Sequence, residues 1–120
     1  MTGAVHPILI VDDDDDVRQT LTELLEDEGY KAVGAGNGVE ALQQLQRSPL
    51  PCVILLDLTM PVMDGLQFRE EQIRDGRLSA IPVVVITAGG RLGKTPPLGM
   101  PVMTKPFDID ALLGLLRLYC

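Results

Sequence analysis

The sequence predicts an α/β domain built on a parallel sheet, and three observations support that prediction. Short apolar runs alternate with segments of helical periodicity along the whole chain, which is typical of repeated β-α units. The apolar runs lack polar alternation, as expected for strands that are covered on both faces. The chain has 120 residues, the size of one ordinary domain, so we expect residues 1–120 to form a single domain.

Five segments are expected to be strands. Each is a short run rich in aliphatic residues; the run at residues 53–56 is the strongest and the run at residues 31–35 is weak. In chain order, the expected strands cover residues 8–11, 31–35, 53–56, 83–86 and 102–103.

Four segments carry apolar residues at helical spacing and are expected to be helices. The first follows an acidic run, whose charges suit a helix N-terminus, and it ends at Glu28-Gly29, where Gly is the usual residue after the last turn. Asp108 is expected to cap the last helix. These helices are centred on residues 17–25, 39–45, 66–73 and 109–116.

The stretch between residues 88 and 101 departs from the alternation of strands and helices. It contains Gly89, Gly90, Gly93, Pro96, Pro97, Gly99 and Pro101. These residues leave little room for a regular helix. We therefore expect the fourth of five β-α units to have a short or irregular helix.

The overall charge limits the classes of partner. The formal net charge is −7 and no basic patch is visible, which argues against direct contact with nucleic acid. The apolar runs are far shorter than the roughly 20 residues of a membrane span, and the N-terminus lacks the basic and apolar regions of a signal peptide. We expect a soluble, cytoplasmic protein without membrane contact.

The two cysteines are too few for a disulfide framework in a chain of this length. Cys52 extends the apolar run of the third expected strand and is predicted to be buried, whereas Cys120 is the last residue. Both are interpreted as structural or incidental. His6 is interpreted as an ordinary surface residue.

Polar residues follow four of the expected strands. They are Asp12, Asp13, Asp57, Thr87 and Lys105. In open α/β sheets, the crevice beyond the carboxyl ends of the strands is where ligands bind. Clustered carboxylates repel one another unless a cation joins them, and Mg²⁺ prefers carboxylate oxygens. The sequence therefore predicts a magnesium site at this edge of the sheet.

This set of residue types suits phosphoryl transfer to a carboxylate. Asp57, alone at its strand end, is the expected nucleophile, and Asp12 and Asp13 are expected to hold Mg²⁺. The hydroxyl of Thr87 and the ammonium of Lys105 would each contact a phosphoryl oxygen. The remaining acids of the run, residues 14–16, are interpreted as a solvated helix-capping patch.

Four segments together resemble the receiver domain of bacterial two-component response regulators, over nearly the whole chain. They are Ile-Leu-Ile-Val-Asp-Asp (8–13), Leu-Leu-Asp-Leu-Thr-Met-Pro-Val-Met-Asp-Gly (55–65), Val-Ile-Thr-Ala (85–88) and Lys-Pro-Phe (105–107). Each segment alone is a weak signal, but the four in this order are highly specific.

The resemblance implies a doubly wound sheet of strand order 2-1-3-4-5 and a phosphoacceptor at Asp57. It also implies Mg²⁺ held by Asp13, Asp57 and the backbone carbonyl of Thr59, with Asp12 acting largely through water. A cis peptide bond before Pro106 is a further implication.

The chain departs from the family pattern in its expected output region. The family has an aromatic residue three positions before the lysine, where this chain has Val102. The segment between Thr87 and Lys105 is also shorter than usual. In the family, this part of the fold commonly serves dimerisation and output, so both departures concern the response to phosphorylation rather than phosphate capture.

Three functional hypotheses remain. The leading one is a receiver that accepts a phosphoryl group on Asp57 from a sensor histidine kinase or a histidine phosphotransfer protein and then changes its affinity for a downstream protein. Such a receiver is no enzyme beyond self-phosphorylation and autodephosphorylation, and a homodimer is left open. The alternative is a phosphorylation-independent, receiver-like interaction module with an atypical output face. A Mg²⁺-dependent phosphatase or phosphotransferase ranks last, because Thr59 stands where a second acid is needed and so short a chain offers no substrate cap.

Overall fold

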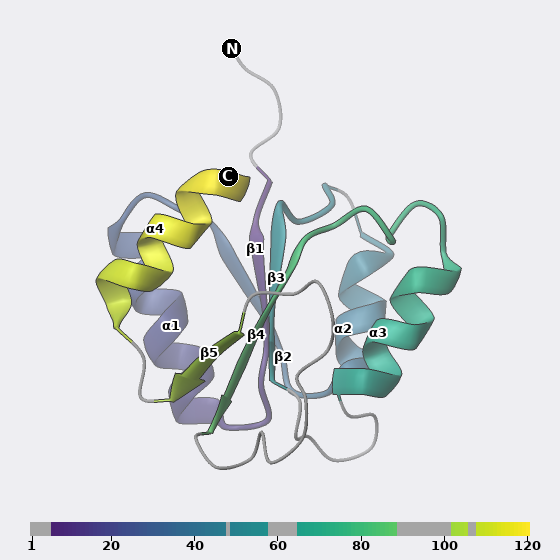
Figure 1. The fold of residues 1–120 in the computed structure, drawn as a ribbon, viewed down its shortest axis with the longest axis horizontal. Coiled ribbons are helices and arrows are strands. Elements are labelled where there is room, and N and C mark those ends of the chain that lie inside the picture. The colour runs from purple at the N-terminus through teal and green to yellow at the C-terminus, as the bar shows by residue number, and fades with distance from the viewer. Residues whose placement is uncertain (1–5, 48, 58–64, 89–101, 106–107) are drawn as a thin grey trace.

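Strands and helices alternate in the computed structural model, which describes residues 6–47, 49–57, 65–88, 102–105 and 108–120 (Figure 1). In chain order, the elements are β1 (Ile8–Val11), α1 (Asp15–Asp27), β2 (Ala32–Ala35), α2 (Gly38–Leu45), β3 (Val53–Asp57), α3 (Gly65–Arg74), β4 (Val83–Ala88), β5 (Val102–Lys105) and α4 (Ile109–Tyr119).

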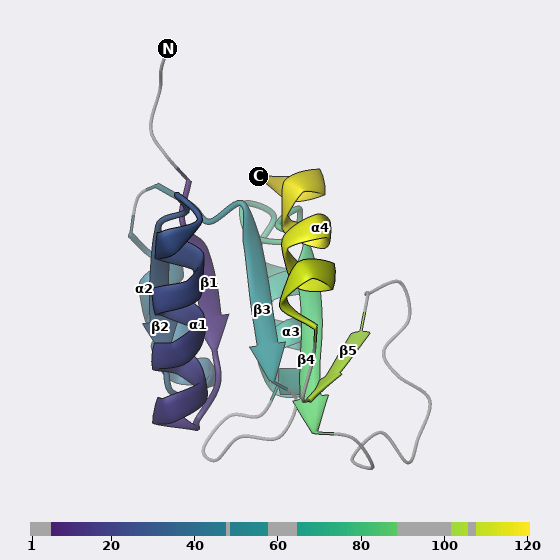
Figure 2. The ribbon, with the colours of Figure 1, turned by 90° about the vertical axis from the view of Figure 1, so that its left-hand side faces the viewer.

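The strands form one parallel, five-stranded sheet in the order β2-β1-β3-β4-β5. The central register pairs Ile8 of β1 with Ala32 on one side and with Val53 on the other. Helices α1 and α4 cover one face of the sheet, and α2 and α3 cover the opposite face (Figures 1 and 2). This arrangement confirms the predicted α/β class with a parallel sheet and helices on both faces.

Side chains that alternate along β1 divide the core into two layers. Leu9 and Val11 pack toward α2 and α3, in a cluster that includes Leu45 and Phe68. The opposite cluster, toward α1 and α4, includes Ile8, Ile10, Leu21, Leu25, Leu112 and Leu116. Because both faces of β1 are fully buried, its sequence is apolar without alternation, as expected for a central parallel strand.

The weak sequence signal of β2 has a structural reason. This strand lies at the edge of the sheet, and only Ala35 among its four residues is buried. An edge strand of small, half-exposed residues buries less apolar surface than a central strand, so its sequence is less apolar. Strand β4 extends two residues beyond the expected end at residue 86.

The helix boundaries follow local chemistry. The carboxylate of Asp14 accepts hydrogen bonds from the amides of Asp16 and Val17 at the start of α1. Helix α1 ends at Glu28-Gly29 as predicted, and Gly29 has φ = 93°, a backbone conformation that favours glycine. Asp108 caps α4 by accepting from the amide of Asp110, which also confirms the prediction.

The buried face of α3 includes a polar residue that the apolar pattern does not reveal. Gln72 is fully buried, whereas its apolar neighbour Ile73 is 54% exposed. The Gln72 amide nitrogen donates to the carbonyls of Leu78 and Ile81, at 2.9 and 3.1 Å. Gln72 therefore satisfies backbone acceptors in the segment that leads into β4, a task that an aliphatic side chain cannot perform.

The interpretation of both cysteines as structural or incidental did not include a bond between them, and the structure gives both a structural role. Cys52 lies just before β3 rather than within it, is half-buried, and forms a disulfide with Cys120, the residue that follows α4. The two Cα atoms are 5.6 Å apart, across a sequence separation of 68 residues. The bond arises because α4 runs back over the sheet and ends beside the start of β3, a proximity that the sequence pattern does not contain.

Two expectations about the fold concern parts of the chain outside the described residues. They are the irregular backbone of residues 89–101 and the cis peptide bond before Pro106. Among the helices that the structure describes, none combines the length and the apolar character needed to cross a bilayer.

Candidate functional site

The carboxyl ends of β1 and β3 bring acidic residues together. Val11, the last residue of β1, pairs with Leu56, so Asp12 and Asp57 follow at the same level of neighbouring strands. Asp57 is itself the last residue of β3 and is only 5% exposed. The parallel register therefore delivers two carboxylates to one edge of the sheet.

Asp12 is fully buried, and several hydrogen bonds fix its position. Its backbone amide donates to the carbonyl of Ala35 at 3.1 Å, and its carboxylate accepts from the amide of Asp14 at 2.9 Å. Its backbone carbonyl accepts from the guanidinium of Arg18 at 2.7 Å. The turn from β1 into α1 is thus held by contacts to the neighbouring strand and to the first helix.

Three carboxylates form a compact cluster. One oxygen from each of Asp12, Asp13 and Asp57 lies within 4.8 Å of the other two. Asp12 and Asp57 are buried, and Asp13 is exposed. Three negative groups at this spacing repel one another, and an all-oxygen set of carboxylates is the donor chemistry that Mg²⁺ prefers. The residues present therefore fit a hard divalent cation.

The backbone positions of Thr87 and Lys105 follow from the pairing of β4 with its neighbouring strands. Thr87 in β4 pairs with Thr104, and the next pair joins Ala88 to Lys105 at the end of β5. Asp57 of β3 pairs with Ile86, one residue before Thr87. The backbones of Thr87 and Lys105 therefore lie at the same edge of the sheet as the carboxylate cluster. Thr59, predicted to offer a backbone carbonyl, lies outside the described residues.

The rest of the acidic run belongs to helix α1. Asp14 is the N-cap residue, and Asp15 and Asp16 occupy the exposed first turn, which agrees with the interpretation as a solvated capping patch. Sequence reasoning missed Arg18, whose guanidinium binds both the carbonyl of Asp12 and the carboxylate of Asp15. The spacing of Asp15 and Arg18, three residues apart at a helix start, was the available signal for the ion pair.

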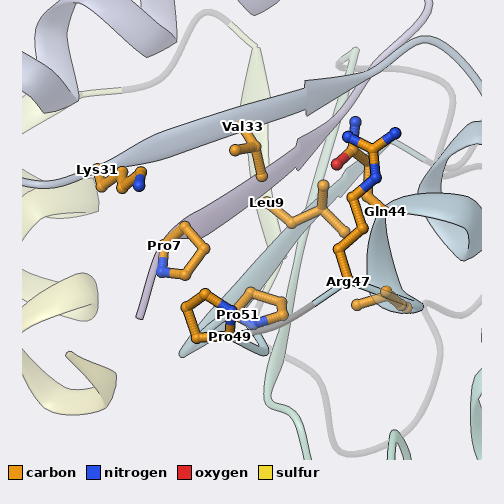
Figure 3. A pocket seen from close by; sticks show the side chains of 9 residues that line it. Pro7, Leu9, Lys31, Val33, Gln44, Arg47, Pro49 and Pro51 are labelled. Atoms are coloured by element: carbon orange, nitrogen blue, oxygen red, sulfur yellow. The ribbon is translucent and has the colours of Figure 1, made fainter. Parts of the chain in front are cut away.

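A pocket lies at the opposite end of the sheet, where the strands begin (Figure 3). Its cavity volume is about 170 Å³, and its lining includes Leu9, Val33 and Leu45, with the cationic residues Lys31 and Arg47. The remaining lining residues are Pro7, Gln44, Pro49 and Pro51. This pocket is separate from the carboxylate cluster and contains none of the predicted site residues.

Comparison with known proteins identifies the family. The model of the response regulator receiver domain matches residues 8–117. The chain belongs to this family. The resemblance inferred from the four sequence motifs is thereby confirmed, and the chain is a receiver domain of the kind found in two-component signal transduction.

Curated relatives differ in how much of their length this receiver domain matches. Response regulator Rre1 of Synechocystis sp. is 37% identical, over 92% of this chain and 49% of the relative. Protein PilH of Pseudomonas aeruginosa is 35% identical, over 88% of this chain and 90% of the relative. Sporulation initiation phosphotransferase F of Bacillus subtilis is also 35% identical, over 93% of this chain and 91% of the relative. The chain therefore spans about half of Rre1 but most of the two smaller proteins.

Solved structures agree with this assignment. The chemotaxis protein CheY4 of Vibrio cholerae superposes with a TM-score of 0.82 at 29% sequence identity, covering 98% of this receiver domain and 100% of CheY4. A sensor protein from Polaromonas sp. JS666 gives a TM-score of 0.84 at 29% identity, covering 97% and 96% of the two chains. Receiver domains are signalling domains, and an aspartyl phosphate and Mg²⁺ are typical of the family.

Proposed function

We propose that this receiver accepts a phosphoryl group on Asp57, in a Mg²⁺-dependent reaction, from a sensor histidine kinase or a histidine phosphotransfer protein. The observation that supports the proposal best is the cluster of Asp12, Asp13 and the buried Asp57 at the carboxyl edge of the sheet. The phosphorylated domain then signals through altered binding to a downstream protein.

The transfer needs one nucleophile and a site that tolerates concentrated negative charge. A carboxylate oxygen of Asp57 attacks the phosphorus of a phosphohistidine, a P–O bond forms, and the P–N bond breaks as the imidazole nitrogen leaves with its electron pair. Asp12, Asp13, Asp57 and the Thr59 carbonyl would hold Mg²⁺, which, when bound, neutralises charge on the carboxylates and the phosphoryl group. Positioning and charge neutralisation are most of what such a transfer requires.

Thr87 and Lys105 are proposed to complete the phosphoryl site. Thr87 lies near the end of β4, the strand next to β3. Lys105 is the last residue of β5, the strand next to β4. The Thr87 hydroxyl is expected to donate a hydrogen bond to one phosphoryl oxygen, and the Lys105 ammonium to form a charge-assisted hydrogen bond with another. In this scheme, the protein performs only its own phosphorylation and dephosphorylation and has no other substrate.

The setting of the domain is also part of the proposal. We place it in the cytoplasm, as a single domain of residues 1–120 that binds neither nucleic acid nor membrane directly. The net charge of −7 supports the absence of direct binding to nucleic acid or membrane, because both nucleic acid and anionic lipid surfaces repel an acidic protein. A homodimer is compatible with the proposal but is not required by it.

One observation favours a second candidate, a receiver-like module that binds its partner without phosphorylation. Val102, at the start of β5, occupies the position of the aromatic residue expected in the family. An aliphatic residue there would interrupt the link between phosphoryl capture and output. A phosphoryl mimic that leaves amide resonances beyond the site unchanged would support this candidate and exclude a working switch.

Intact-protein mass after incubation with a small phosphodonor tests the leading proposal. We expect one added phosphoryl group on the wild type with Mg²⁺, none without Mg²⁺, and none on Asp57→Asn. Asp27→Asn is the matched control, since Asp27 is an exposed acid in the last turn of α1, and it should label like the wild type. Labelling of Asp57→Asn to the wild-type level would refute the assignment of the phosphoacceptor.

A further inference from the structure

Arg18 links the carboxylate cluster to helix α1. One guanidinium nitrogen donates to the backbone carbonyl of Asp12 at 2.7 Å, and another forms an ion pair with the carboxylate of Asp15. The Arg18 side chain is only 25% exposed, whereas that of Asp15 is 84% exposed. The guanidinium is therefore held mainly at the backbone of Asp12 and not free in solvent.

Strand β2 is shaped to receive this side chain. A Cβ atom added at Gly34 would lie 2.9 Å from Cδ of Arg18 and 3.1 Å from its Cγ. Such contacts are too short for carbon atoms, so the stem of Arg18 occupies the space that any other residue at position 34 would fill. At Gly36, an added Cβ would lie 3.7 Å from a guanidinium nitrogen of Arg18. That distance at Gly36 is an ordinary van der Waals contact, so it is Gly34, within β2, that leaves room for Arg18 to reach Asp12.

We propose that Arg18 is a positioning residue for the metal site, a role that rests on the proposed function. Arg18 fixes the carbonyl of Asp12, and with it the turn whose next two residues are Asp13 and the helix cap Asp14. The carboxylate of Asp12 is itself bound by the amide of Asp14. Loss of the guanidinium would therefore loosen the geometry of both Asp12 and Asp13.

The direction in which Mg²⁺ affinity changes when Arg18 is replaced separates this positioning role from a purely electrostatic one. Arg18 carries a positive charge close to the cluster, and a like charge opposes binding of a divalent cation. If only this charge mattered, its removal would tighten Mg²⁺ binding. If Arg18 positions the carboxylates, its removal weakens Mg²⁺ binding in spite of the lost repulsion.

Arg18→Met provides the test, because methionine keeps an unbranched stem against Gly34 but lacks the guanidinium. Residues that orient metal ligands typically change metal affinity by 10–100-fold when mutated, so we expect about tenfold weaker Mg²⁺ binding. The affinity would be measured by titrating the folded protein with Mg²⁺ and following its amide resonances. Unchanged or tighter binding in Arg18→Met would overturn the proposal.

Arg74→Met is the matched control. Arg74 also pairs with an acid three residues away, Glu71, but this pair is exposed on α3. The control removes the same charge and the same kind of ion pair, and it should bind Mg²⁺ like the wild type. A second variant, Gly34→Ala, keeps the guanidinium but displaces its stem, and it should weaken Mg²⁺ binding in the same direction as Arg18→Met.

A metal-free readout separates failure of this inference from failure of the proposed function. In the absence of Mg²⁺, Arg18→Met should shift the carbonyl carbon resonance of Asp12 and the amide of Asp14, and Arg74→Met should shift neither. If the wild type does not bind Mg²⁺, the proposed function fails while these resonances still report on positioning. If the resonances of Asp12 and Asp14 match those of the wild type, the positioning role is wrong.

Discussion

Asp57 and Asp12 are brought together by the register of their strands, without unusual side-chain geometry. Each lies at the carboxyl end of a fully buried strand, and the register of β1 and β3 alone brings them level. Asp12 is held by its neighbours in sequence and by Ala35 of β2. A buried carboxylate with fixed hydrogen bonds has lost most of its conformational freedom before any ligand arrives, which lowers the entropic cost of binding.

At the same scale, Thr87 and Lys105 are expected to have separable roles. In the proposed scheme, the Thr87 hydroxyl senses a phosphoryl oxygen, so Thr87→Ala should still accept a phosphoryl group but show a weaker conformational response. Lys105→Ala should slow labelling and weaken the response, because it removes a cation from the developing charge. The rate of mass labelling and the amide shifts induced by a phosphoryl mimic measure the two effects. Equal losses in both variants would contradict this division.

At the scale of elements, helix α3 depends on a buried polar contact. Gln72→Met keeps the length of the side chain but removes the donor to the carbonyls of Leu78 and Ile81. We expect the free energy of unfolding to fall by about 2 kcal/mol, since buried acceptors are left unsatisfied. Urea denaturation measures the change.

The adjacent Ile73 offers the control for this prediction. Because Ile73 is exposed, Ile73→Met should change the free energy of unfolding by no more than about 0.5 kcal/mol. A Gln72→Met variant as stable as Ile73→Met would show that the buried amide contributes nothing to holding the segment between α3 and β4.

Elements whose signal is local could be predicted from the sequence. The run at residues 8–11, the cap at Asp108 and the stop at Gly29 each depend on a few neighbouring residues, and the structure has each where it was expected. The buried role of Gln72 could not be recognised, because the acceptors of its amide nitrogen are backbone carbonyls, which leave no trace in the sequence. The position of Arg18 could not be predicted for a related reason. It depends on the space left by Gly34, a residue of another element.

At the scale of the whole molecule, the two ends of the sheet carry different features. The predicted acids gather at the carboxyl ends because parallel strands place all their ends on one side, so the sequence could predict the cluster of Asp12, Asp13 and Asp57. The opposite end, where the strands begin, carries the C-terminus of the chain (Figure 1). There the bond between Cys52 and Cys120 joins α4 to β3. That pairing depends on the path of the whole chain and therefore could not be predicted from local pattern.

This disulfide is expected to contribute to stability without affecting the phosphoryl site. Cross-linking residues that are 68 positions apart restricts the unfolded chain, and the loop-entropy relation gives about 4 kcal/mol for a loop of this length. Urea denaturation with and without a dithiol reductant should show a loss of that order, whereas Mg²⁺-dependent labelling of Asp57 below the unfolding transition should not change.

A Cys52→Ala/Cys120→Ser double variant should match the reduced protein and be insensitive to the reductant. Since the cytosol keeps most thiols reduced, a cytoplasmic receiver would work mainly in the less stable form. Equal free energies of unfolding for the oxidised and reduced proteins would show that the bond adds no stability beyond what packing of α4 already supplies.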